Sequence, residues 1–168
     1  MTGVTTVLGV DPGTLATGWG IVRSDGRVLS MVATGVIRTR PADPLWDRLA
    51  QIHGVIAELA AEHRPAALSL EQCFVSKNVQ SALKLGHTRG VIMVAARGLG
   101  AEIFEYAPSQ VKSAVTGSGK AEKHQVAEMI RILLKLDKAP PADASDALAA
   151  AICHINHGTN RILQAARR

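Results

Sequence analysis

"VLGVDPGTLATGWGIV", residues 7–22, has the pattern of two apolar strands joined by a short loop, with an aspartate where the first strand ends. Pro12 and Gly13 follow Asp11 directly and favour a tight turn. The Asp11 carboxylate therefore borders an apolar strand, and an unpaired buried charge is costly. We expect Asp11 to have a partner that offsets this cost, and that partner should indicate the function.

The composition indicates a single domain. The chain has 168 residues, 47% of them hydrophobic, and a chain of this length buries roughly 70% of its unfolded surface. Its longest apolar runs fall short of the roughly 20 residues that a membrane-spanning helix needs, and the N-terminus lacks a signal-peptide pattern. The two cysteines, Cys73 and Cys153, are far apart. This spacing favours a reducing cytoplasm over a disulfide framework or a zinc site.

The charge is unevenly distributed. The formal net charge is +5, and residues 77–138 contain all seven lysines and three arginines against five acidic residues. A basic middle third suggests a surface for a polyanion, with nucleic acid as the leading candidate. An ordinary solvated basic face explains the charge equally well.

The order of apolar patterns predicts an α/β fold. Three strands in a meander are followed by alternating helices and strands, which implies a mixed five-stranded sheet with helices on both faces. Strands are predicted at 4–10, 17–24, 27–39, 66–71 and 101–107, and helices at about 43–63, 78–97, 108–115, 122–135 and 142–157. Residues 1–157 are expected to form the one domain and residues 158–168 a basic tail.

Four acidic residues lie where elements begin or end. Asp11 and Glu71 end two predicted strands, and ligands of α/β sheets gather near strand ends. Asp143 and Asp146 share one face at the start of a helix whose remainder is apolar and must be buried. Each residue also has a simpler explanation, since strands often end in exposed loops and acids cap helices.

If these carboxylates converge, they repel one another. Two such charges 4 Å apart cost about 4 kcal/mol at an effective dielectric constant of 20. A cation would relieve that cost, and an all-oxygen ligand set favours Mg²⁺ or Mn²⁺ over zinc. Clusters of this kind hold paired ions in phosphodiester cleavage.

Four motifs resemble one family. "GVDPGTLATGWGIV", "SLEQCFVSKNVQSALKLGHTRG", "YAPSQVKSAVTGSGKAEKHQV" and "PADASDALAAAICH" are similar, in order and spacing, to the RuvC family of bacterial Holliday-junction resolvases. The resemblance implies a ribonuclease-H-like fold and a Mg²⁺-dependent homodimeric endonuclease that cuts two opposed strands of a four-way DNA junction, leaving 5′-phosphates. It also implies partnership with the RuvA and RuvB branch-migration proteins. The family's catalytic acids fall on Asp11, Glu71, Asp143 and Asp146.

The same resemblance suggests DNA contacts. Phe74 occupies a position where the family has an aromatic residue beside the junction centre, and base stacking there is worth about 1–3 kcal/mol. Lys112 and Lys123 match basic residues near the scissile phosphate. The other predicted contacts rest on proximity alone: Lys77, Lys84, Arg89 and Lys120. His87 and Thr88 depart from the family's usual Gln-Ala.

Several alternatives stay open. Asp11-Pro12-Gly13-Thr14 also matches the first phosphate loop of actin-like and sugar-kinase ATPases, although those need two such domains. A junction-binding module without catalysis is the third possibility.

Segment 116–123 lacks the residues of a Walker loop, so nucleotide binding there is not expected. His154 and His157 are expected to be surface or core residues, with no metal role. Gly86 and Gly90 interrupt a predicted helix, which implies close approach by the chain's own sheet or by a second subunit.

Overall fold

The computed structural model describes residues 4–72 and 78–165. Five strands form one sheet, in the order β3-β2-β1-β4-β5. The strands are β1 (Thr5–Asp11), β2 (Ala16–Ser24), β3 (Leu29–Arg38), β4 (Ala67–Glu71) and β5 (Glu102–Tyr106). The first three pair antiparallel, whereas β4 is parallel to both β1 and β5. The predicted mixed sheet is confirmed.

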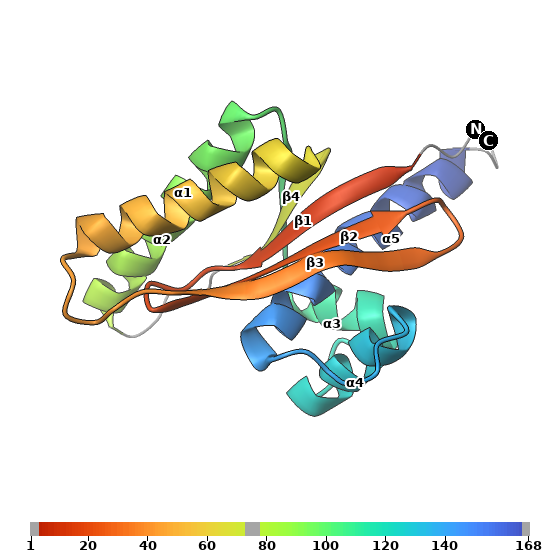
Figure 1. Cartoon of the computed structure of the whole chain (residues 1–168). Coiled ribbons are helices and arrows are strands. Elements are labelled where there is room, and N and C mark those ends of the chain that lie inside the picture. Colours follow the sequence, from red (N-terminus) through yellow and green to blue (C-terminus); the bar gives the residue numbers. More distant parts are fainter. Residues whose placement is uncertain (1–3, 73–77, 166–168) are drawn as a thin grey trace.

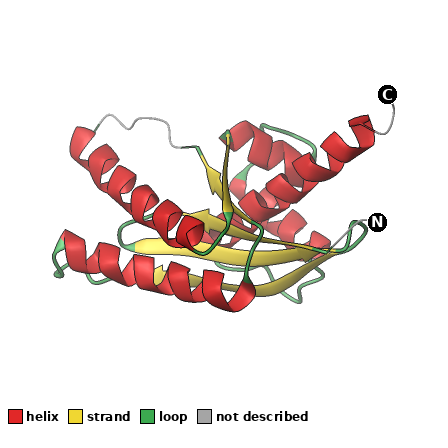
Figure 2. Ribbon diagram, turned by 90° about the horizontal axis from the view of Figure 1, so that it is seen from above, coloured by secondary structure: helices red, strands yellow, loops and turns green. Residues whose placement is uncertain are grey.

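Helices cover both faces of this sheet (Figures 1 and 2). On one face, α1 (Leu45–His63) and α2 (Val79–Gly98) pack on a core of aliphatic side chains such as Leu8, Val10 and Leu68. On the other face lie α3 (Pro108–Thr116), α4 (Lys123–Leu133) and α5 (Ala142–Ala165), over a second apolar core. A helix able to cross a membrane is absent from the described residues.

The last helix is longer than predicted. The sequence prediction ended it at residue 157, before Gly158, but α5 continues to Ala165. That boundary was wrong because one glycine costs a helix only about 1 kcal/mol and does not end it. The division into a domain at 1–157 and a tail at 158–168 stays a prediction, although its two parts share a helix.

Helix α5 lies unusually close to β1 and β2. A Cβ atom added to Gly9 would overlap the Ala147 carbonyl oxygen, and one added to Gly18 would overlap the backbone of Asp143. The facing residues of α5 are also small, since Ala144, Ala147 and Ala151 are all buried. Glycine in the strands and alanine in the helix therefore let the two backbones approach.

A hydrogen bond ties the same helix to the next strand. The buried Ser69 hydroxyl of β4 donates to the Ala150 carbonyl of α5 over 2.6 Å. A buried hydroxyl without a partner would be costly, so this bond fixes the helix over β4 as well as over β1 and β2.

We expect Gly9→Ala and Gly18→Ala each to lower the free energy of unfolding by about 2–3 kcal/mol, because the added methyl group has no room. Chemical denaturation at one temperature measures this. Gly54→Ala is the control, since nothing lies within 4 Å of a Cβ at this position in α1, and it should raise stability by up to about 1 kcal/mol. A Gly18→Ala protein as stable as the parent would show that α5 can move outward at no cost.

Candidate active site

The sheet brings Asp11 and Glu71 together. Val10 of β1 and Leu70 of β4 are register partners in the parallel pair, and Asp11 and Glu71 are the next residue of each strand. Side chains alternate along a strand, so each acid shares a face with the residue two positions before it. Those residues are Gly9 and Ser69, which both contact α5. Both carboxylates therefore project on the α5 side of the sheet.

The start of α5 adds the second pair of acids. The Asp143 backbone lies against Gly18, and Gly18 is the register partner of Asp11. Asp146 follows one turn later on the same helix. Asp11, Glu71 and Asp146 line one hollow of about 290 Å³ together with Lys112 of α3 and Lys123 of α4. Asp143 does not line this hollow, although its charge acts on Asp11.

Burial and crowding of charge alter the acidity of the site. Burial, together with the charges of Asp146, Asp143 and Glu71, raises the pKa of Asp11 to about 7. Burial and the charge of Asp146 also raise the pKa of Glu71. The ordinary value for either carboxyl lies near 4, so the structure resists holding all of these groups ionised at once.

Lys123 partly compensates for this repulsion. Its ammonium group lies 3.1 Å from Oδ2 of Asp146, and that hydrogen bond raises the pKa of Lys123. The Lys123 side chain is 80% exposed whereas that of Asp146 is 30% exposed. An ammonium so exposed can leave the carboxylate without crossing the protein interior.

The donor set suits a hard divalent cation. It consists of carboxylates alone, and the raised pKa values mark groups that a cation would stabilise in their ionised form. Among the described residues, no three Asp, Glu, His or Cys side chains already stand as a set of metal ligands. Asp146 is paired with Lys123 in this structure.

Arg89 has a structural role that the sequence did not indicate. Its guanidinium donates to the Glu71 carbonyl oxygen over 2.7 Å and forms an ion pair with Glu105 of β5. The Arg89 side chain is only 11% exposed. Arg89 therefore holds α2 against the ends of β4 and β5 and supports Glu71 from behind, while its predicted DNA contact stays a prediction.

Of the other predicted DNA contacts, four lie among the described residues and two do not. Lys84, Lys120 and Lys123 are exposed, and Lys112 is half-buried where it borders the carboxylates. Phe74 and Lys77 lie outside the described residues.

The structure also places His87 and Thr88, which depart from the family's usual Gln-Ala, and the two histidines of α5. Thr88 is buried and its hydroxyl donates to the Lys84 carbonyl, whereas His87 is exposed. His154 shares a hydrogen bond with the Tyr106 hydroxyl, and His157 contacts Cys153. Both histidines are therefore partly buried and have partners within the protein.

Comparison with known proteins decides the family. The family model for crossover junction endodeoxyribonuclease RuvC matches residues 7–154. The chain belongs to the RuvC family. A relative of that name from Halorhodospira halophila is 49% identical over 92% of each chain, and one from Sodalis glossinidius is 48% identical over 95% of this chain and 92% of its own.

Solved structures agree with this assignment. Thermus thermophilus RuvC superposes with a TM-score of 0.87 at 34% identity, covering 94% of this chain and 97% of that one. The same protein in complex with a Holliday junction substrate gives 0.85 at 33% identity, covering 92% and 95%. The yeast mitochondrial resolvase Ydc2 shares the fold at 11% identity, with a TM-score of 0.61 over 94% of this chain and 86% of that one. The predicted resemblance and ribonuclease-H-like fold are confirmed.

Sequence reasoning missed the residues that create the site's geometry. It did not identify Gly9, Gly18 and Gly20, which admit α5, or the role of Arg89 behind Glu71. Alternating glycines in an otherwise apolar strand were the available signal, because such glycines mark close approach of another backbone.

The raised pKa of Asp11 predicts how stability depends on pH. Folding raises this pKa from about 4 to about 7, so the folded state binds the proton more tightly. Protonation of Asp11 therefore contributes to the free energy of unfolding. This contribution is full below about pH 4 and is lost as the pH rises through about 7. In EDTA at about pH 8, Asp11→Asn should therefore raise the free energy of unfolding by about 2–4 kcal/mol, and near pH 4 the difference should vanish. Equal stability of the two proteins at both pH values would contradict the crowded-carboxylate description.

Proposed function

We propose that this chain hydrolyses phosphodiester bonds in four-way (Holliday) DNA junctions, with Asp11, Glu71, Asp143 and Asp146 holding divalent metal ions. The observation that carries the proposal is the convergence of acids from β1, β4 and α5 at one hollow that two lysines also border. Membership of the RuvC family supports the same reaction. It also favours the nuclease over the ATPase alternative.

The chain's own residues would divide the work. A bound Mg²⁺ or Mn²⁺ pair would supply Lewis-acid stabilisation of the attacking and leaving oxygens. Asp11 and Glu71, fixed on adjacent strands, define the position of the reacting phosphate along the edge of the sheet. Lys123 exchanges Asp146 for a phosphate oxygen, and Lys112 on α3 faces the same hollow. Each lysine can offset negative charge that develops in the transition state.

We predict that Asp11→Asn, Glu71→Gln, Asp143→Asn and Asp146→Asn each slow junction cutting by at least about a hundredfold, because each removes a charge that the metal ions need. Junction binding should persist or tighten, since repulsion toward the phosphates falls. Gel assays of a synthetic four-way junction with Mg²⁺, with Mn²⁺ and with EDTA measure cutting, and band shifts measure binding.

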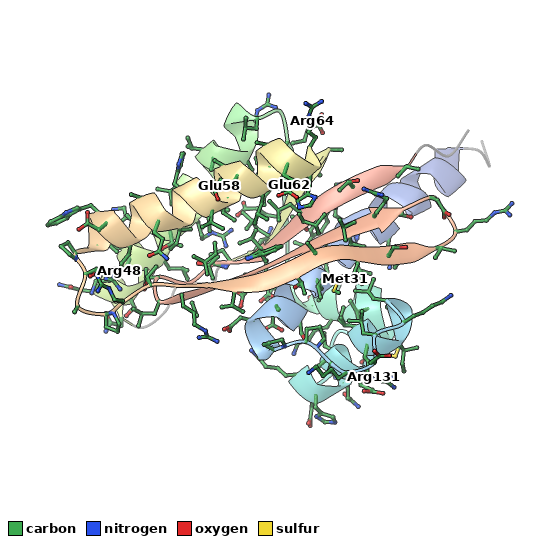
Figure 3. All side chains as sticks on the ribbon, viewed as in Figure 1. Met31, Arg48, Glu58, Glu62, Arg64 and Arg131 are labelled. Atoms are coloured by element: carbon green, nitrogen blue, oxygen red, sulfur yellow. The ribbon has the colours of Figure 1, made fainter. Side chains whose placement is uncertain are left out.

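Glu58→Gln is the matched control, because Glu58 is an exposed acid on α1 (Figure 3), and α1 lies on the opposite face of the sheet from α5. It should cut at the parent rate. Parent-like cutting by any one of the four active-site variants would remove that residue from the proposal. If the wild-type chain binds junctions and never cuts them, it is a binding module.

We further propose that the enzyme acts as a homodimer through α2. This helix buries Ile92 and Ala96 on one face and leaves Val79, Leu83 and Val94 exposed on the other. Gly86 and Gly90 lie on the exposed side, and within the described residues a Cβ at either position would meet nothing within 4 Å. The chain's own sheet therefore does not need these glycines, which leaves a second subunit as the reason for them. An isologous pair would present two sites to strands related by two-fold symmetry.

Replacing Gly90 by leucine tests this surface. The variant should keep its fold, because the position is open, but should sediment as a monomer. Supercoiled cruciform plasmid should then yield nicked circles in place of linear product. Gly54→Leu, at the open helical position on α1, is the control and should stay dimeric. A dimeric Gly90→Leu protein that still linearises the plasmid would place the two-fold axis elsewhere.

The remaining expectations rest on the family resemblance or on composition. Cooperation with RuvA and RuvB belongs to the first group, and a cytoplasmic location to the second.

A further inference from the structure

A second hollow lies where α1 and α2 begin. It has a volume of about 280 Å³ and is lined by residues of the loop after β1, of α1 and of α2: Thr14, Leu15, Arg48, Ser81, Lys84 and Leu85. Figure 3 labels Arg48 near the start of α1, at the same end of the molecule as the β1–β2 loop. Two of its lining residues are cationic, two carry hydroxyl groups and none is acidic.

Arg48 lines this hollow and also has an unpaired donor. Its Nε atom is buried and has no hydrogen-bond partner among the residues that the structure describes. Leaving such a donor unpaired is costly, and more so for a charged group. Guanidinium groups match the geometry of phosphate and can donate two parallel hydrogen bonds to it. The Arg48 guanidinium, the second cation of Lys84 and the hydroxyl groups of Thr14 and Ser81 line one hollow and together suit a phosphate.

The hollow adjoins the proposed active site. Leu85 also lines a further hollow, which contains Asp11, Glu71 and Arg89. Asp11 and Glu71 in turn line the hollow that contains Lys112 and Lys123. The three hollows therefore adjoin one another through shared lining residues, with Lys112 and Lys123 at one end, the carboxylates in the middle and Arg48 with Lys84 at the other end.

We propose that the Arg48–Lys84 hollow binds one backbone phosphate of the DNA strand whose neighbouring phosphodiester is cut. This inference rests on the proposed function and extends it to a positioning subsite. A phosphate held there would fix the strand along the series of hollows, so that the scissile phosphate meets the carboxylates. Arg48 and Lys84 act on position and do not touch the reacting atoms.

Binding measurements on the full-length chain test the subsite. With a fluorescent four-way junction in EDTA, Arg48→Gln should weaken binding by about tenfold, as expected for loss of a charged hydrogen bond. Lys84→Gln should weaken binding less and lower the slope of log affinity against log salt by about one. Arg27→Gln is the control, because Arg27 is exposed in the β2–β3 hairpin.

A neutral-phosphate scan identifies the contact. Methylphosphonate is placed at one position at a time on both sides of the cut site. One substituted position near the cut should weaken binding of the wild-type chain and should not weaken Arg48→Gln or Lys84→Gln further. In Mg²⁺, the same two variants should also cut with less accurate placement along the strand, which a merely structural defect would not produce.

The failure of this inference differs from failure of the proposed function. If the wild-type chain binds and cuts junctions while Lys84→Gln and a folded Arg48→Gln behave like Arg27→Gln, the subsite is wrong and the nuclease stands. Lys84 is exposed, so its variant tests the subsite even if Arg48→Gln unfolds, as thermal melting would reveal. A wild-type chain that binds no junction would overturn both.

Discussion

The close contact between α5 and the β1–β2 hairpin is the constraint on which the rest of the structure depends. Gly9, Gly18 and Gly20 have no side chains that would hold the helix away. The alanines of α5 that face them are small enough to allow the same close approach. The Asp143 backbone then rests on Gly18, the register partner of Asp11. A packing requirement in the core therefore determines the distance between carboxylates that are 132 residues apart in the sequence.

That contact creates an electrostatic cost that the free chain only partly offsets. A pKa of about 7 for Asp11 means that the folded chain favours the proton there, and Lys123 supplies a positive charge to Asp146. Protonation of Asp11 and the Lys123–Asp146 ion pair are both reversible, because a proton can dissociate and an exposed lysine can turn away. A site that stays folded with these temporary counterions, and that gains from a divalent cation, combines stability with the ability to load its proposed metal ions.

The sequence predicted the order and type of every element because its apolar patterns are clear and its turns carry glycine or proline. It predicted Asp11 and Glu71 as candidates for one site because each ends a largely apolar strand. The end of α5 could not be predicted from Gly158, because the cost of one glycine is too small to end a long helix. The structural role of Arg89 could not be predicted, because a sequence shows charge and not burial. The fold shows that its guanidinium contacts the Glu71 carbonyl oxygen and the Glu105 carboxylate.

Helix α2 explains how one element can serve several purposes. Apolar residues lie on two of its faces: Ile92 and Ala96 are buried against the sheet, whereas Leu83 and Val94 are exposed. Arg89 points toward the ends of β4 and β5, and Leu85 borders the hollows on either side of it. If the exposed face is the two-fold interface, each subunit's Glu71 is linked to the partner through a single rigid helix. The spacing between the two cutting sites would then be a property of α2 packing, and the two-fold symmetry of the pair would match that of the junction.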